Sequence, residues 1–300
     1  MAEYHHFEQA AEANNISQST LSTMISRFED EIQVKLFDCK KKPVQVTKEG
    51  LVIIEQLKNI TNNIEQLKEL VKEVKGEESG ILTLSVIPST APFLLPLFLQ
   101  DFASKFPNLT IKVREETLTE IIKKLKFREL DIGIISTPLN ENELLELKLY
   151  DKPFVFFDAN EVQNQLVSIK KIEMKNLCLL EEGHCMRTQV LQLCDMCDQQ
   201  LDSKLNFEFK AGSIDSLLRF LKANKASTLL PYLAVNDFSN QEKTHLSHFS
   251  SPVPYHTVSL AVHRHFVKKK RLEILQEDII HKISSILSKT DMSNEILLPV

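Results

Sequence analysis

The stretch Ser17-Gln18-Ser19-Thr20-Leu21-Ser22-Thr23-Met24-Ile25-Ser26-Arg27-Phe28-Glu29-Asp30-Glu31-Ile32 decides how the N-terminal part of the chain is interpreted. Ser17 is a residue type that caps helices, and the apolar residues after it recur at helical spacing: Leu21, Ile25, Phe28 and Ile32. Short polar or basic side chains lie opposite them: Ser19, Ser22, Thr23, Ser26 and Arg27. A face of this kind fits the major groove of DNA, where bulky or acidic groups would clash with or repel the duplex. The pattern predicts a DNA-recognition helix over 18–32, with an ordinary surface hairpin as the alternative.

The residues after this helix predict a wing. Two short strands are expected on either side of Lys40, Lys41 and Lys42, whose ammonium groups suit contact with phosphates. A run of lysines is more often a solvated turn, but its position directly after the helix favours a winged helix-turn-helix over 1–50. A shorter helix is expected before it, over 3–14.

Residues 50–75 carry a heptad pattern that favours dimerisation. The apolar positions are separated alternately by four and three residues, at Ile53, Leu57, Ile60, Ile64, Leu67, Val71 and Val74. A seam this narrow is best buried against a second helix, so a linker and dimerisation helix is predicted over 51–76. One face of an ordinary globular helix is the alternative. The segment Gly76–Gly80 ends the pattern and is the best candidate for a hinge.

From residue 81 the pattern alternates between strand and helix, which predicts a largely parallel α/β sheet in two lobes. Strands are expected at Ile81–Ile87, Leu109–Arg114, Asp131–Ile135, Phe154–Phe157, Asn176–Leu180, Asn206–Lys210, Thr228–Leu230 and Thr257–His263. Helices are expected at Pro92–Lys105, Thr119–Phe127, 186–198, 213–223 and 269–289. This two-lobed C-terminal domain is placed at 80–300, with lobe I at about 80–158 and 252–300 and lobe II at about 159–251.

Two hydroxyl groups, of Ser89 and Thr90, follow the first of these strands where a helix begins. Capping of that helix is the first interpretation of both residues. The second is a ligand pocket, because ligands in such folds bind at the carboxyl ends of strands, between the lobes.

The stretch Gly183-His184-Cys185-Met186-Arg187 places a cysteine at the expected start of a helix, between a histidine and an arginine. Helix N-termini and neighbouring cations lower the pKa of a thiol, and the thiolate is the form that attacks a peroxide. A small buried cysteine is the alternative. Cys194 lies nine residues further on, or about 13 Å along an unbroken helix. A disulfide spans about 4.4–6.8 Å between Cα atoms, so joining the two cysteines requires the helix to unwind.

Composition limits the remaining possibilities. The chain has 36 basic and 41 acidic residues and a net charge of −5, so any contact with DNA must come from a local patch. No apolar run reaches the ~20 residues of a membrane span, and five cysteines do not suggest a disulfide framework, which points to a cytoplasmic protein. The pair Cys194-x-x-Cys197 has metal-ligand spacing but lacks two further ligands, so no metal is expected. The sequence has no Gly-rich phosphate loop or paired catalytic carboxylates, so no cofactor and no enzyme activity are expected.

Several motifs resemble the LysR-type bacterial transcription regulators. They are Phe7-x-x-Ala10-Ala11, Ser17-Gln18-Ser19-Thr20-Leu21-Ser22, Phe28-Glu29, Leu36-Phe37 and Thr47-x-x-Gly50. Glu181-Glu182-Gly183-His184-Cys185-x-Arg187-x-Gln189-x-x-x-x-Cys194 resembles the redox centre of that family's hydrogen-peroxide sensors, the OxyR group. The resemblance implies a periplasmic-binding-protein-like regulatory domain of two lobes. It also implies that Cys185 reacts with peroxide, that Cys194 resolves the product as a disulfide, and that Ser89, Thr90, His184 and Arg187 line the peroxide pocket.

The resemblance also implies the partners: double-stranded DNA, hydrogen peroxide, RNA polymerase and a second copy of the chain in a homodimer or homotetramer, with no membrane partner. DNA would be contacted by Gln18, Ser19, Thr20, Ser22, Thr23, Arg27, Lys40, Lys41 and Lys42. Three departures are visible: the family's first helix starts earlier than this chain does, Ser19 stands where the family often has Pro, and Cys39 where it has a basic residue. Cys197 is a competing partner for Cys185. The main alternative is a LysR-type regulator that binds a small metabolite between its lobes; a metabolic enzyme or a solute-binding protein is a further alternative.

Overall fold

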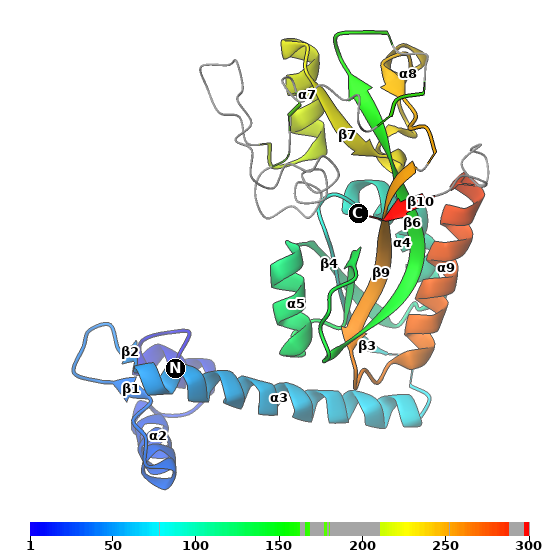
Figure 1. Cartoon of the computed structure of the whole chain (residues 1–300). Helices are drawn as coiled ribbons and strands as arrows, with labels where there is room; N and C mark the ends of the chain where they lie inside the picture. The colour runs from blue at the N-terminus through cyan, green and yellow to red at the C-terminus, as the bar shows by residue number, and fades with distance from the viewer. Residues whose placement is uncertain are drawn as a thin grey trace. The chain divides into compact units, whose positions relative to one another are not determined.

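The computed structural model has two compact units, Met1–Lys68 and Glu69–Val300. It describes residues 1–77, 79–162, 166–168, 177–178, 180, 211–251, 253–287 and 297–299. In this part of the chain, no helix combines the length and apolar composition needed to cross a bilayer. Figure 1 shows the arrangement of elements within each unit.

The N-terminal unit is a helix-turn-helix followed by a small two-stranded wing. Its elements are α1 (Phe7–Ala13), α2 (Gln18–Ile32), β1 (Phe37–Asp38) and β2 (Gln45–Val46), and the two strands pair antiparallel. The hydroxyl of Ser17 accepts a hydrogen bond from the backbone N–H of Thr20 and caps α2, as predicted. Helix α1 starts later than the 3–14 prediction, because His5 forms hydrogen bonds with Val44 instead of continuing the helix.

Two motifs of the N-terminal unit hold the wing in place. The buried carboxylate of Glu29 accepts hydrogen bonds from the backbone N–H groups of Leu36, at 2.7 Å, and Phe37, at 3.1 Å. The hydroxyl of Thr47 donates to the carbonyl oxygen of Lys35 and accepts from the N–H of Gly50. A Cβ atom on Gly50 would lie 2.4 Å from the carbonyl oxygen of Leu36, so this position requires glycine. The backbone around β1 is therefore fixed by side-chain hydrogen bonds from Glu29 of α2 and from Thr47, just before the next helix.

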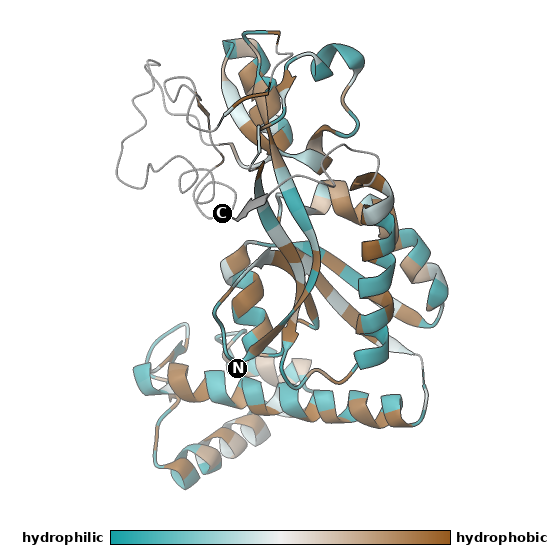
Figure 2. Ribbon diagram, turned by 45° about the vertical axis from the view of Figure 1, so that its right-hand side comes forward, coloured by the Kyte–Doolittle hydropathy of each residue, from teal (hydrophilic) through white to brown (hydrophobic). Residues whose placement is uncertain are grey.

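Helix α3 spans Lys48–Val74, close to the predicted 51–76. Apolar side chains of its heptad pattern are exposed, including Ile60, Ile64, Leu67, Val71 and Val74. Figure 2 shows alternating apolar and polar residues along this helix. Large exposed apolar side chains in a row leave an uncovered surface on the single chain.

The second unit is built on a mixed sheet, not the largely parallel sheet that was predicted. The strand order is β4-β3-β5-β9-β6-β7; β3 pairs parallel with β4 and β5, while the pairings β5–β9, β9–β6 and β6–β7 are antiparallel. The strands are β3 (Gly80–Val86), β4 (Leu109–Glu115), β5 (Ile132–Thr137), β6 (Leu144–Asp158), β7 (Ser227–Pro231), β8 (Leu246–Ser247), β9 (Val253–His263) and β10 (Leu297–Pro299). The prediction of a largely parallel sheet failed because the long strand β9 lies between β5 and β6 and is antiparallel to both.

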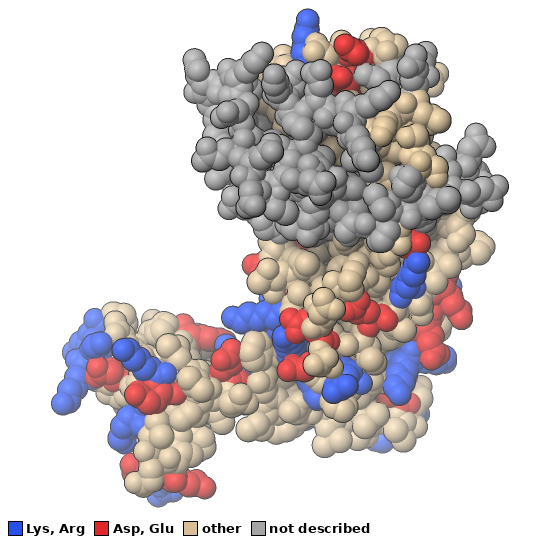
Figure 3. Space-filling view, viewed as in Figure 1, with Lys and Arg blue, Asp and Glu red and all other residues tan. Residues whose placement is uncertain are grey.

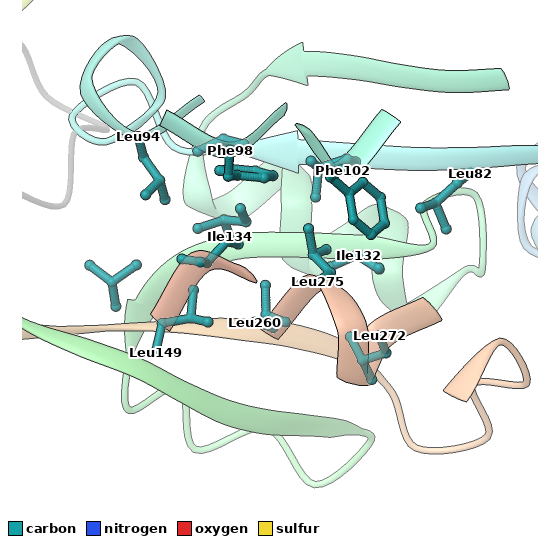
Figure 4. Close-up of a cluster of buried hydrophobic side chains, with 14 of the residues drawn as sticks. Leu82, Leu94, Phe98, Phe102, Ile132, Ile134, Leu149, Leu260, Leu272 and Leu275 are labelled. Atoms are coloured by element: carbon teal, nitrogen blue, oxygen red, sulfur yellow. The ribbon is translucent and has the colours of Figure 1, made fainter. Parts of the chain in front are cut away.

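Helices cover both faces of this sheet. They are α4 (Ala91–Lys105), α5 (Leu118–Lys126), α7 (Ile214–Asn224), α8 (Asn240–Lys243) and α9 (Lys269–Leu287), with a short helix η3 at Tyr232–Val235. Helices α4 and α9 pack against β3, β5 and β9 to form a first hydrophobic core. Helix α5 packs with Ile135 and Ala261 in a separate cluster. Figure 4 shows side chains of α4 and α9 meeting those of β3, β5 and β9 in this first core.

A second hydrophobic core lies around the later strands. It joins Phe154–Phe157 of β6 to residues of α7 and β7. Strand β6 belongs to both cores, because Leu149 and Tyr150 contribute to the first. Phe93 of α4 also packs against both cores. The point where β6 passes from one core to the other is therefore close to the start of α4.

Candidate functional site

The first candidate site is the outer face of α2 in the N-terminal unit. Of the side chains predicted to contact DNA, Ser22 is partly buried and the others on α2 are exposed: Gln18, Ser19, Thr20, Thr23 and Arg27. Two of their hydroxyls also bond within the helix: Thr20 Oγ1 lies 2.7 Å from Ser17 Oγ, and Thr23 Oγ1 donates to the carbonyl oxygen of Ser19 at 2.9 Å. These bonds restrain the two threonines on a surface that remains open.

The wing carries the lysine run at its tip. Lys40, Lys41 and Lys42 are all exposed between β1 and β2. Lys41 Nζ lies 2.9 Å from Gln45 Oε1 and 3.9 Å from a carboxylate oxygen of Asp38, so the base of the wing orients one of the three. Figure 3 shows basic side chains gathered at this end of the N-terminal unit, with acidic groups among them.

The second candidate site lies where α4 begins in the second unit. Ser89 and Thr90 are buried there, each with 2% of its surface exposed. Thr90 occupies the N-cap position of α4, but its side chain makes no capping hydrogen bond, so the capping interpretation of Thr90 is wrong. Its hydroxyl oxygen instead lies 3.5 Å from the ammonium group of Lys152. The Thr90 side chain is therefore directed to β6.

Lys152, which reaches this hydroxyl, is paired with His256 across strands β6 and β9. Both side chains are buried. Burial and the positive charge of Lys152 lower the pKa of His256 from 6.5 to about 4. His256 is consequently neutral at pH 7, while its Nδ1 lies 3.1 Å from the carbonyl oxygen of Thr257. The site thus combines a hydroxyl, an ammonium group and a neutral imidazole, all shielded from solvent.

Sequence reasoning did not find Lys152 and His256. The signal for Lys152 was a charged residue directly before the apolar run Pro153-Phe154-Val155. His256 lies in a strand that was predicted to begin one residue later. Their proximity depends on the register of β6 against β9, which periodicity does not reveal.

The predicted redox residues His184, Cys185, Arg187, Cys194 and Cys197 lie outside the described residues. So do the predicted strand 206–210 and helix 186–198. The described residues before and after this segment are Leu180 and Ala211, which form an isolated parallel β-bridge with each other. Leu177 bridges Ser227 of β7 in the same way, in the region of the predicted strand 176–180.

The two cysteines within the described residues have different surroundings. Cys178 is partly buried against the second core, and burial raises the pKa of its thiol. Cys39 is exposed near the wing, and the pKa of its thiol is raised by partial burial and by Glu29 and Asp38. A raised pKa reduces the thiolate fraction, so neither has the setting of a reactive cysteine.

Four histidines at close spacing, in His245-x-x-His248 and His263-Arg264-His265, could supply imidazoles to a metal. His245 Nδ1 lies 3.0 Å from the carbonyl oxygen of Asp158, and His263 Nδ1 accepts a hydrogen bond from the N–H of His265. Within the described ranges, His, Cys, Asp and Glu side chains do not gather in threes that could hold a metal ion.

A winged helix-turn-helix, a long linker helix and a two-core α/β unit together define a class of DNA-binding transcription regulators that carry a sensing domain. Two family models match the chain. Residues 1–51 match the bacterial regulatory helix-turn-helix protein of the lysR family, and residues 75–276 match the LysR substrate binding domain. The chain therefore belongs to the LysR family of transcription regulators.

Similar proteins include several of the OxyR group. The hydrogen peroxide-inducible genes activator of Haemophilus influenzae is 26% identical over 96% of this chain and 95% of its own length. The DNA-binding transcriptional dual regulator OxyR of Escherichia coli is 28% identical over 93% of this chain and 91% of its own length. A solved full-length OxyR variant from Pseudomonas aeruginosa superposes with a TM-score of 0.72, at 27% identity, over 93% of this chain and 94% of that one.

Proposed function

We propose that this LysR-family regulator senses hydrogen peroxide through a thiol–disulfide switch and changes the transcription of its target genes in response. The observation that carries the proposal is the sequence Gly183-His184-Cys185 with Cys194 nine residues later, in a chain similar over nine-tenths of its length to hydrogen peroxide-inducible activators. The regulator acts in the cytoplasm as a homodimer or homotetramer on double-stranded DNA, together with RNA polymerase.

The chemistry has two steps. The thiolate of Cys185 attacks one oxygen of the peroxide, the O–O bond breaks, and hydroxide leaves as the sulfur becomes a sulfenic acid. The thiol of Cys194, or of Cys197, then attacks the oxidised sulfur, a disulfide forms and water leaves. His184 and Arg187 supply the positive charge that favours the thiolate and the departing hydroxide.

The buried groups at the start of α4 support this proposal. Hydroxyls at Ser89 and Thr90 suit a peroxide, which both donates and accepts hydrogen bonds. The ammonium group of Lys152, 3.5 Å from the Thr90 hydroxyl, adds positive charge where hydroxide would leave. The sequence predicts a helix over 186–198, so a disulfide between Cys185 and Cys194 would unwind it, and this change carries the oxidation to the DNA-binding units.

Two DNA-binding units are needed to read the two halves of an operator. The exposed apolar stripe on α3 supplies a surface on which two chains can pair. The side chains of α2 from Gln18 to Arg27 would read the major groove, and the wing lysines Lys40–Lys42 would bind phosphates.

The test is the rate at which each thiol of the full-length reduced protein reacts with micromolar peroxide, followed by peptide mapping of the disulfides. Cys185 is expected to react at least about a hundredfold faster than Cys178, whose thiol pKa is raised by burial. A Cys185→Ser variant should lose the response, while Cys39→Ser should retain it. If Cys185 reacts no faster than free cysteine, the peroxide proposal fails, and a metabolite bound between the lobes becomes the working hypothesis.

A further inference from the structure

The last turns of α3 are held against the regulatory unit by charged groups. Glu69, in the second-last turn, has a carboxylate oxygen 2.7 Å from Lys72 Nζ and the other 3.9 Å from Lys268 Nζ. Gly80, the first residue of β3, has a φ angle of +123°, and a Cβ atom there would lie 3.2 Å from a Glu69 carboxylate oxygen. The side chain of Glu69 therefore rests on the backbone at the start of the sheet.

Lys268 is the centre of this arrangement. Its side chain is 3% exposed, and its ammonium group donates to the carbonyl oxygen of Ile81 at 2.8 Å and to both carboxylate oxygens of Asp131 at 3.0 Å. Asp131 also accepts hydrogen bonds from the N–H and the hydroxyl of Thr83. A buried ion pair with this many hydrogen bonds has one well-defined geometry.

Arg271 makes a second connection one turn further along α9. This buried side chain donates from Nη2 to the carbonyl oxygen of Glu77 at 3.2 Å. The same nitrogen lies 3.9 Å from a carboxylate oxygen of Glu73 on α3. Both the end of the helix and the turn that follows it are thus joined to the start of α9.

The preceding turn of α3 is different. Glu65 and Lys68 form an ion pair there, but both side chains are exposed and both belong to α3 itself. Exposed pairs of this kind contribute little rigidity, because solvent screens the charges and the side chains are free to move. The compact regulatory unit correspondingly begins at Glu69 and not at the glycine turn.

We propose that Lys268 and Arg271 form a lock that makes the last turns of α3, from Glu69 on, part of the regulatory domain. The pivot between the two parts of the molecule then lies before Glu69, N-terminal to the Gly76–Gly80 segment that the sequence suggested as a hinge. A movement of the regulatory domain carries the end of α3 with it and is not absorbed by the glycines. The lock does not depend on which ligand the regulatory domain senses.

The experiment is amide hydrogen exchange of the full-length protein, followed by mass spectrometry of peptides that cover 69–77 and 53–64. The main variant is Glu69→Gln combined with Glu73→Gln, because both side chains are partly exposed and their replacement leaves the buried Lys268–Asp131 pair intact. Glu65→Gln is the matched control on the same helix. Lys268→Met is the stronger variant, with its fold checked by circular dichroism.

The double variant is expected to raise the exchange rate of 69–77 about tenfold, because local opening no longer has to break the lock, and to leave 53–64 unchanged. The control should leave both peptides at wild-type rates. Equal exchange of 69–77 in the double variant and the control would overturn the lock. Because the readout needs no peroxide, this result is independent of whether Cys185 is a sensor.

Discussion

His256 shows how one buried residue links the fold to pH. It pairs with Lys152 across two strands, and burial together with that positive charge lowers its pKa from 6.5 to about 4. Between these two pH values the unfolded chain binds a proton at this residue and the folded chain does not. Folding stability therefore falls as the pH drops from 6.5 to 4, and the contribution of His256 is constant above that window.

The first prediction concerns this window. His256 binds a proton in the unfolded state but not in the folded state between pH 7 and pH 5. The free energy of unfolding should therefore fall by about 2 kcal/mol over this range because of His256. The pH dependence of a His256→Gln variant should be smaller by that amount. Urea unfolding of the reduced protein at both pH values measures it. His248→Gln, at an exposed histidine, is the control, and equal pH dependence in all three proteins would refute the buried neutral imidazole.

At the scale of elements, the wing illustrates how a local patch can act against the overall charge. The compact N-terminal unit contains eight Lys or Arg residues and ten Asp or Glu residues, so its net charge does not attract DNA. The lysines at the wing tip are nevertheless exposed together, while Glu29 is buried and its carboxylate accepts backbone hydrogen bonds. Attraction to phosphates then depends on a few side chains.

The second prediction follows from this dependence. Replacing Lys40 and Lys42 by Gln should weaken DNA binding similarly for all sequences and reduce the slope of log K against log salt by about one for each phosphate that is no longer bound. Titration of an operator fragment at several salt concentrations measures both quantities. Lys58→Gln, on α3, is the control. An unchanged slope in the double variant would show that the wing does not bind phosphates.

At the scale of the whole molecule, the exposed stripe on α3 bears on assembly. Ile60, Ile64 and Leu67 are each at least half exposed although they are large and apolar. Their spacing is that of a seam between two helices. Because about half of each side chain is already covered, burying the rest against a second copy gains on the order of 1 kcal/mol for each one, which favours pairing of two chains.

The third prediction is that Ile64→Asp combined with Leu67→Asp lowers the oligomeric state by disrupting this seam. Placing charges in an apolar helix contact should shift the dimerisation constant by at least about a hundredfold. Sedimentation equilibrium of the full chain measures the shift. Asn63→Asp, beside the stripe on the same helix, is the control. If both variants keep the oligomeric state of the wild type, another surface holds the assembly together.

The sequence by itself determined the elements that depend on local patterns. The spacing of apolar residues defined α2 and α3, Ser17 marked a helix start, and the alternation of strands and helices gave the order of most elements. The roles proposed for Cys185 and Cys194 also come from the sequence, through a local motif and its family resemblance. Local sequence is enough for these inferences because helix periodicity, capping and thiol chemistry depend on a few neighbouring residues.

Only the tertiary structure decided which distant residues meet. The insertion of β9 between β5 and β6 made the sheet mixed and brought His256 beside Lys152. The Thr90 hydroxyl lies next to Lys152 of β6 and does not cap its own helix. The same applies to Lys268, which reaches Asp131 and Glu69 from the residue directly before α9. Strand register and buried ion pairs depend on the packing of the whole domain, since the burial that makes these interactions strong is created by residues far away in the sequence.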